Sequence, residues 1–176
     1  MAKSANLHET HLMKLPGKSH WLGLSLAVIV LDQISKHVVA EHLQVFETVY
    51  VLPVFNIALL HNAGAAFSLL AGEPGWQRWF FVVLALLIVA SIVAWLWRMP
   101  AEGNRWIAAA VALVAGGAVG NVWDRLVNGY VVDFLQFHWQ GWFFPAFNVA
   151  DSAITLGACL LLLDGVFLQR RAQGVK

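Results

Sequence analysis

Charged residues are scarce in this sequence. Asp, Glu, Lys and Arg make up 12% of the 176 residues, whereas soluble domains are about a quarter charged. Hydrophobic residues make up 60%, and the formal net charge is +1. We therefore predict an integral membrane protein. The sequence also has no Gly-rich phosphate loop and no stripe of basic and aromatic residues, so we expect no nucleic acid partner.

Cysteine is nearly absent. Cys159 is the only one, which excludes an internal disulfide and a cysteine-based metal site. It lies in an apolar run, where packing is the expected role. The sequence has neither an HExxH zinc motif nor a G-x-S-x-G nucleophile elbow, and its histidines are dispersed. We therefore expect no metal and no cofactor. No internal repeat is visible, which disfavours a transporter built from paired halves.

Four apolar stretches approach the roughly 20 residues that a helix needs to cross a bilayer. They cover about 21–40, 79–97, 106–123 and 149–168. The nine Trp residues fall near the ends of these stretches or between them, as an interfacial belt would. A secretory signal peptide is the competing interpretation of the first stretch, but Asp32 and Lys36 interrupt its apolar run.

Basic residues divide between the two sides of these predicted spans. One side holds both termini and the short loop near residue 100, and its basic residues are Lys3, Lys14, Lys18, Arg98, Arg105, Arg170, Arg171 and Lys176. The other side holds Lys36, Arg78 and Arg125. The positive-inside rule then places the termini in the cytoplasm. We expect 1–20 and 169–176 to be cytoplasmic tails of a single integral membrane domain over 21–168.

Two longer segments, 42–75 and 126–147, are expected on the opposite, outer side of the membrane. Residues 45–52 and 54–60 are rich in β-branched and aromatic residues and are separated by Pro53, which predicts two strands of a small sheet. The segment 65–70 is expected to form a loop or short helix. The predicted fold class is an all-α membrane protein with four transmembrane helices, a small periplasmic β-sheet as a cradle, and an outer aromatic or helical segment.

Two aspartates, Asp133 and Asp151, lie among apolar and aromatic residues on either side of one short aromatic stretch. A carboxylate there costs free energy unless it is paired, hydrated or protonated. If the two meet, they titrate as a coupled pair that holds one proton at neutral pH. The ionised member can then take a proton from water, while the protonated member hydrogen-bonds the scissile carbonyl. This pattern predicts an aspartyl peptidase.

Asp151 also has a structural interpretation. Asn148 and Asp151 share a helical face, so Asn148 can be an N-cap and Asp151 a charge favoured by the helix dipole. That interpretation leaves Asp133 unexplained.

The other polar residues fall at the same end of the predicted spans. Asp32 and Lys36 are four residues apart and can form an ion pair, either a simple pair near the interface or one that shapes the site. Asn121 shares one helical face with Asp124 and with Arg125. They can fix the end of the helix, or Arg125 and Asn121 can contact substrate. The small residues at 116–120 predict close helix packing in the same span.

Five blocks of the sequence together resemble bacterial lipoprotein signal peptidase, also called signal peptidase II. In the family's order they are DQISK at 32–36, NAGAAFS at 62–68, GGAVGNVWDR at 116–125, GYVVDF at 129–134 and FNVADS at 147–152. The resemblance implies an aspartyl endopeptidase of the bacterial inner membrane. Such enzymes remove signal peptides from diacylglyceryl-modified prolipoproteins, cutting just before the lipidated cysteine, and are inhibited by the cyclic peptide globomycin.

The resemblance also assigns residues. Asp133 and Asp151 match the catalytic pair. The family's other site positions match Asp32, Asn62, Gly64, Asn121, Asp124, Arg125 and Asn148. With Lys36, the predicted partner of Asp32, these are the substrate-binding candidates. Membrane lipids are expected partners, and a mobile segment near 62–70 is hypothesised to cover the site.

Two rival functions remain at this point. A small proton-coupled transporter or channel subunit with intramembrane carboxylates predicts ionisable groups spread through the membrane depth, whereas here they cluster at one end. A structural assembly subunit predicts that Asp133 and Asp151 tolerate substitution by Asn.

Overall fold

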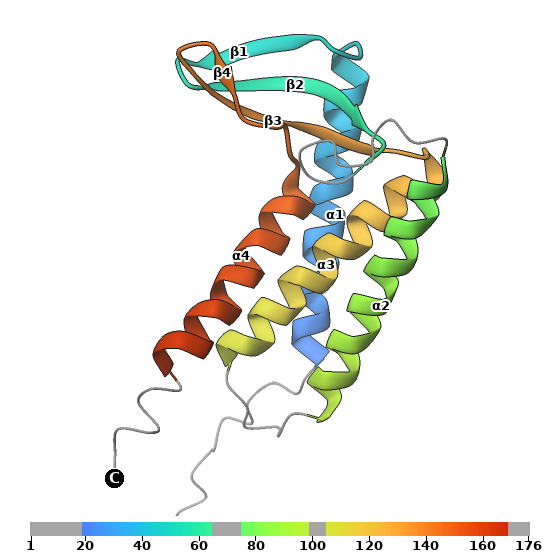
Figure 1. Cartoon of the computed structure of the whole chain (residues 1–176), viewed down its shortest axis with the longest axis vertical. Coiled ribbons are helices and arrows are strands. Elements are labelled where there is room, and N and C mark those ends of the chain that lie inside the picture. Colours follow the sequence, from blue (N-terminus) through green and yellow to red (C-terminus); the bar gives the residue numbers. More distant parts are fainter. Residues whose placement is uncertain (1–18, 65–74, 99–104, 169–176) are drawn as a thin grey trace, which may run out of the picture.

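The structure is a computed structural model that describes residues 19–64, 75–98 and 105–168. Four helices are joined to a small sheet at one end (Figure 1). The helices are α1 (Ser19–His42), α2 (Trp76–Arg98), α3 (Arg105–Val127) and α4 (Val149–Leu163), which continues as the π-helical turn η2 (Asp164–Leu168). The strands are β1 (Thr48–Leu52), β2 (Phe55–Asn62), β3 (Val131–Trp139) and β4 (Trp142–Phe143).

All four helices are long and apolar enough to cross a membrane, which confirms the four predicted spans to within a few residues at their ends. The predicted tails lie outside the described residues, except that Ser19 and His20 begin α1. The predicted loop or short helix at 65–70, and with it most of the hypothesised cover, also lies outside them.

Helix α3 is the centre of the bundle and packs against α1, α2 and α4 (Figure 1). In its apolar window 61% of residues are buried, against 6–22% in the other three helices. Small residues make this possible. A Cβ at Gly116 would lie 2.7 Å from the backbone oxygen of Ser25 in α1, and one at Gly117 would overlap the backbone of Ala150 in α4. The close packing predicted for 116–120 is therefore confirmed.

The sheet has the order β1-β2-β3-β4, with each neighbouring pair antiparallel. The two strands predicted within 45–60 are confirmed as β1 and β2. The second outer segment is aromatic, as expected, but it is extended rather than helical and forms β3 and β4. Its Val, Phe and Trp residues favour extended backbone, and β2 offers an edge whose unpaired backbone groups need a partner.

This topology brings the two predicted catalytic aspartates to one place. Strand β3 follows α3 after a short turn and pairs Asp133 with Leu60 of β2. The chain then returns, and Phe147 exchanges backbone hydrogen bonds with Leu135 (2.8 and 3.0 Å) immediately before α4 begins. The start of α4 is thus fixed against the strand that carries Asp133, at the end of the bundle covered by the sheet (Figure 1).

Candidate active site

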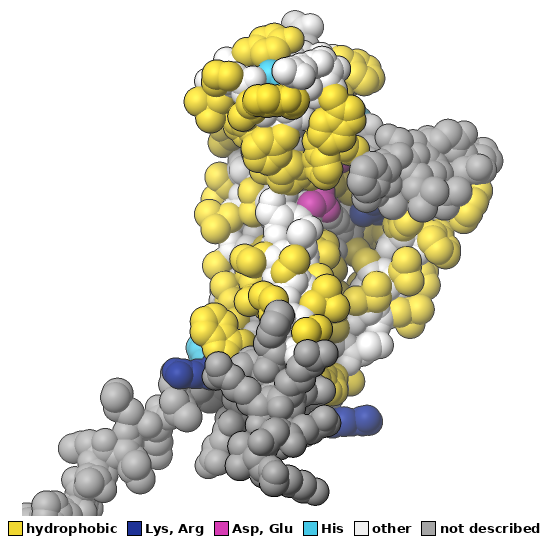
Figure 2. All heavy atoms as spheres, turned by 60° about the vertical axis from the view of Figure 1, so that its left-hand side comes forward, with side chains coloured by type: hydrophobic (Ala, Val, Ile, Leu, Met, Phe, Trp, Pro, Cys, Tyr) yellow, Lys and Arg dark blue, Asp and Glu magenta, His cyan; other side chains and the backbone are white. Residues whose placement is uncertain are grey.

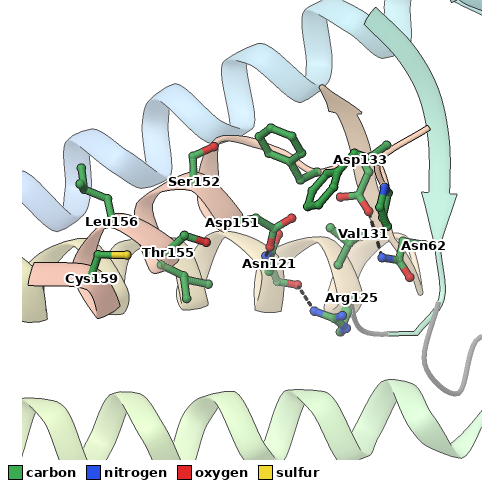
Figure 3. Close-up of a pocket in the computed structure, with 15 residues that line it drawn as sticks. Asn62, Asn121, Arg125, Val131, Asp133, Asp151, Ser152, Thr155, Leu156 and Cys159 are labelled. Carbon is green, nitrogen blue, oxygen red and sulfur yellow. Dashed lines mark hydrogen bonds between the residues drawn. The ribbon is translucent and has the colours of Figure 1, made fainter. Parts of the chain in front are cut away.

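A cavity of about 700 Å³ opens where the sheet meets the helices. Asp133 and Asp151 both lie in its wall (Figure 3). Near these two aspartates, the other polar residues that line the cavity are Asn62, Asn121 and Arg125. From there the cavity continues along α4, past Ser152, Thr155, Leu156 and Cys159. In the space-filling view, acidic atoms are visible directly below the hydrophobic side chains of the sheet, between white atoms on one side and basic atoms on the other (Figure 2).

Asp133 is 3% exposed, and both of its carboxyl oxygens accept hydrogen bonds from side-chain amides. Asn148 Nδ2 donates to Oδ1 at 2.7 Å, and Asn62 Nδ2 donates to Oδ2 at 2.9 Å. Burial raises the pKa of Asp133 to about 7, with a further contribution from the charge of Asp151, although the two amide bonds act in the opposite direction. A pKa in this range suits Asp133 to exchange a proton near neutral pH.

Asp151 lies in the first turn of α4, and its carboxyl oxygens also each accept one hydrogen bond. Asn121 Nδ2 donates to Oδ1 at 2.8 Å, and the backbone N–H of Asn148 donates to Oδ2 at 3.3 Å. In return, the backbone N–H of Asp151 donates to Asn148 Oδ1 at 2.8 Å, which completes a capping box. The N-cap interpretation of Asn148 is thus confirmed, and the cap holds the Asp151 carboxyl at the cavity wall.

Asn148 connects the two aspartates. Its Oδ1 caps α4 at Asp151, and its Nδ2 donates to Asp133. The same Nδ2 group lies 3.2 Å from Asn121 Oδ1 and 3.2 Å from the backbone oxygen of Val132. Because Asn148 is fully buried, this side chain has one fixed orientation, and it sets the position of each carboxyl relative to the other.

A buried ion cluster lies behind this pair. Lys36 Nζ is 2.7 Å from Asp32 Oδ2 and 2.8 Å from Asp124 Oδ2. The ion pair predicted between Asp32 and Lys36 is confirmed, but it is buried, with side chains 0% and 4% exposed, rather than close to water. The sequence had not indicated that Asp124 joins it. A single ammonium between two carboxylates is stable in the interior only when the remaining oxygens are also hydrogen-bonded.

Those oxygens do have partners. Asp32 Oδ1 accepts the backbone N–H of Ala150 at the start of α4 (2.9 Å). Asp124 accepts Gln33 Nε2 at 2.9 Å and the backbone N–H of Val132 at 3.1 Å. Gln33 had no predicted role, yet it bridges α1 and α3 through this contact with Asp124. The only signal for it was its place in the 32–36 block, because its partner is on another helix.

The ion cluster reaches the cavity through Asn121. Lys36 Nζ donates to Asn121 Oδ1 at 3.0 Å. Since the amide oxygen accepts from the lysine, the amide nitrogen must point the other way, toward Asp151 Oδ1. The charge of Lys36 therefore determines which end of Asn121 faces Asp151.

Arg125 closes one side of the cavity. Its Nη2 donates to the backbone oxygen of Gly64 at 2.7 Å, and its guanidinium lies 5.2 Å from the ring centre of Phe81. The N–H of Gly64 in turn donates to Asn62 Oδ1 at 3.0 Å. With its oxygen engaged in this way, Asn62 presents its amide nitrogen to Asp133.

The predicted site residues thus fall into three groups. The cavity wall contains Asn62, Asn121, Arg125, Asp133 and Asp151. The buried layer behind it contains Asp32, Lys36, Asp124 and Asn148. Gly64 contributes backbone groups to Arg125 and Asn62. Ser152 and Thr155, one and four residues after Asp151, line the cavity without having been predicted. Among the described residues, no group of three His, Cys, Asp or Glu side chains is arranged to hold a metal ion.

Comparison with known proteins identifies a family that this chain matches in sequence. The model of the family described as "Signal peptidase (SPase) II" matches residues 24–167. A lipoprotein signal peptidase of Pseudomonas aeruginosa is 51% identical over 150 residues, covering 84% of this chain and 88% of that protein. A lipoprotein signal peptidase of Acinetobacter baumannii is 52% identical over 151 residues, covering 86% and 85%.

The fold is also similar to solved structures. One of them, described as a bacterial membrane enzyme, has a TM-score of 0.77 and 30% sequence identity, over 90% of this chain and 92% of that one. A second with the same description has a TM-score of 0.73 over 85% and 94%. The family match extends from α1 to η2 and includes every residue of the cavity wall, so the chain belongs to the signal peptidase II family of peptidases.

Proposed function

We propose that the chain is an aspartyl endopeptidase that removes signal peptides from diacylglyceryl-modified prolipoproteins, cutting just before the lipidated cysteine. The main support is one observation: the buried carboxyl of Asp133 and the half-buried carboxyl of Asp151 share Asn148 as a hydrogen-bond partner in the wall of an otherwise largely apolar cavity. Such a pair is suited to hold a single proton and to act on a water molecule between its members.

The two aspartates have different surroundings, which suggests different roles. Asp151 lies at the N-terminus of α4, where the helix dipole favours a negative charge. Asp133 lies on a strand away from any helix start, and its pKa is raised to about 7 mainly by burial. In the proposed mechanism Asp151 is the carboxylate that takes a proton from the attacking water. Asp133 is the protonated member, which donates to the scissile carbonyl oxygen.

This reaction needs only water and the two aspartates, and no cofactor. The water oxygen bonds to the carbonyl carbon while its proton moves to Asp151, and the oxyanion is stabilised by the hydrogen bond from Asp133. When the carbon–nitrogen bond breaks, Asp151 gives that proton to the leaving nitrogen. The amides of Asn62, Asn121 and Asn148 hold the two carboxyls in place throughout, because each already donates to one of them.

The cavity is suited to a substrate that is partly in lipid. Its walls along α4 include Ile154, Leu156 and Cys159, on a helix whose apolar window is only 22% buried. An apolar signal helix and acyl chains can therefore approach from the bilayer. We place the protein in the bacterial inner membrane, with both termini in the cytoplasm and the sheet on the periplasmic side, and expect globomycin to bind in this cavity.

The test is cleavage of a diacylglyceryl-modified prolipoprotein by the purified chain and by Asp133→Asn and Asp151→Asn. Each variant should lose at least about 100-fold in kcat, since each removes a proton-transfer group. Both should keep globomycin binding and a cooperative thermal transition, which separates lost chemistry from lost folding. Full activity in either variant would remove that aspartate from the mechanism.

A further inference from the structure

A second cavity, of about 420 Å³, meets the first at Asp133. Asn62, Asp133 and residues 144–146 line both cavities. The remaining lining residues of the second cavity are Phe46, Leu60, His61, Gln136 and Phe143. All of these belong to the sheet or to the turn that leads into it. The first cavity instead continues along α4. The two cavities therefore extend from Asp133 over different parts of the fold, one along a helix and one across the sheet.

A peptide whose scissile bond lies at Asp133 has a chain segment on each side of that bond. The apolar signal segment fits the cavity along α4, because that helix is exposed to the bilayer. The segment on the other side must continue into the remaining space that Asp133 borders, which is the second cavity. We propose that the second cavity binds the start of the mature chain, the residues that follow the lipidated cysteine, with Phe46 and Gln136 as specificity-determining residues. This inference rests on the proposed function.

The lining of the second cavity is suited to an extended, uncharged peptide. Apart from Asp133, its only titratable lining group among the described residues is His61. Burial lowers the pKa of His61, which stacks on Tyr130 with 3.8 Å between ring centres, and this disfavours a positive charge on the ring. Gln136 offers both a donor and an acceptor for the free N–H and C=O groups of an extended backbone. Phe46 and Phe143 supply apolar walls for its side chains.

Phe46 has an unusual backbone conformation. Its φ angle is +71°, a region that bulky residues rarely adopt. Its N–H donates to the backbone oxygen of Leu59 at 2.8 Å, and the N–H of Leu59 donates to Glu47 at 3.0 Å, which fixes the turn against β2. The ring remains 78% exposed, so burial within the chain does not compensate for this strain. Strained residues of this kind cluster at ligand sites, and this one holds an aromatic ring at the edge of the second cavity.

The experiment compares two diacylglyceryl-modified substrates with the same signal sequence. One ends at the lipidated cysteine as an amide, and the other continues for several mature residues. The readout is the ratio of kcat/KM for the extended substrate to that for the truncated one, measured with the purified chain. We expect a ratio well above one for the unmodified chain. Phe46→Gly should lower that ratio about tenfold, the usual effect of losing one aromatic contact, and Gln136→Ala should lower it severalfold.

Phe46→Gly also distinguishes an effect on substrate binding from an effect on folding, because glycine accepts a positive φ without strain. Its thermal midpoint should therefore stay level or rise while the ratio falls. Tyr50→Ala is the matched control: Tyr50 is 72% exposed on the same part of the sheet and lines neither cavity, so the ratio should stay the same. Equal efficiencies on both substrates, or ratios that neither cavity variant changes, would overturn the inference. Failure of the unmodified chain to cleave either substrate would instead refute the proposed function.

Discussion

Asn148 donates from Nδ2 to Asp133 at 2.7 Å while its own Oδ1 accepts the backbone N–H of Asp151. One buried side chain therefore caps a helix and aligns the proposed catalytic pair. Capping requires only a side-chain oxygen, whereas contact with Asp133 also requires a donor that extends further. The two tasks can be separated by substitution.

Asn148→Ser should keep the N-cap of α4 and lose the hydrogen bond that aligns Asp133 with Asp151. Ser is as good an N-cap as Asn, but its hydroxyl is shorter than the amide that contacts Asp133. We expect stability within about 1 kcal/mol of the unmodified chain and a loss of peptidase activity of about tenfold or more. Thermal unfolding in detergent and cleavage of a prolipoprotein measure the two effects.

Asn148→Ala is the matched variant, because it removes both the cap and the alignment. It should unfold more easily than the Ser variant by a further ~1 kcal/mol while cleaving no faster. If the Ser variant retained full activity, Asn148 would be a cap alone.

Lys36→Met should destabilise the fold strongly. It removes the ammonium between Asp32 and Asp124, whose side chains are 0% and 3% exposed, and leaves two carboxylates buried without a cation. Breaking a buried pair in this way costs about 3–5 kcal/mol. The free energy of unfolding in detergent measures the loss, and adding Asp124→Asn should recover part of it by removing one of the uncompensated charges.

The control is a pair with the same spacing on the same helix. His37 and Glu41 are also four residues apart and 3.0 Å from each other, but their side chains are 74% and 57% exposed. Exposed pairs contribute little, so His37→Ala should cause no measurable change. Equal effects of Lys36→Met and His37→Ala on the free energy of unfolding would show that burial does not determine how much the ion cluster contributes to stability.

The parts of this fold that the sequence predicted are those set by local pattern. Apolar length is enough to find the four spans, and the β-branched and aromatic runs around Pro53 are enough to find β1 and β2. Strand β3 was not predicted, because its conformation depends on the edge of β2, and no local pattern shows which segment will pair with that edge.

The same limit applies to the site. The cost of burying Asp133 and Asp151 is visible from their apolar neighbours, and the family resemblance marks the other site positions. The contacts of Asp124 with Lys36, and of Asn148 with Asp133, cross between different elements of the fold. Sequence spacing indicates which residues share a helix face, but not which face another helix will cover. Gln33 had no predicted role for the same reason.

Gly120→Ala tests how closely α3 must approach the ion cluster. A Cβ at Gly120 would lie 2.7 Å from Asp32 Oδ2. Asp32 is short, fully buried and bonded to Lys36 and to the backbone N–H of Ala150, so it cannot move away without breaking those bonds. We expect a loss of about 1–3 kcal/mol in unfolding free energy, as for other overpacked cores. Gly23→Ala is the matched control, because nothing lies within 4 Å of a Cβ at that helical position. A comparable loss at Gly23 would indicate a general effect of alanine rather than contact with Asp32.

The pKa of Asp133 predicts how stability depends on pH. The carboxyl has a pKa of about 7 in the folded chain and about 3.9 when unfolded. Between these values the folded state holds a proton that the unfolded state has released, so the free energy of unfolding falls as pH rises. The contribution from this group is complete below about pH 4 and is lost above about pH 7.

Asp133→Asn removes the titration, because an amide stays neutral throughout. The thermal midpoint of the unmodified chain, measured in detergent from pH 4 to 8, should therefore decline relative to that of the variant as pH rises. The variant is also destabilised by an amount that does not depend on pH. Asn62 and Asn148 already supply donors, so one amide nitrogen would face another. The informative quantity is thus the change with pH in the difference between the two midpoints. Glu41→Gln, at an exposed carboxylate, should follow the unmodified chain. Parallel curves for Asp133→Asn and the unmodified chain would mean that Asp133 is already ionised across this range, and its proposed role as the protonated member would then fail.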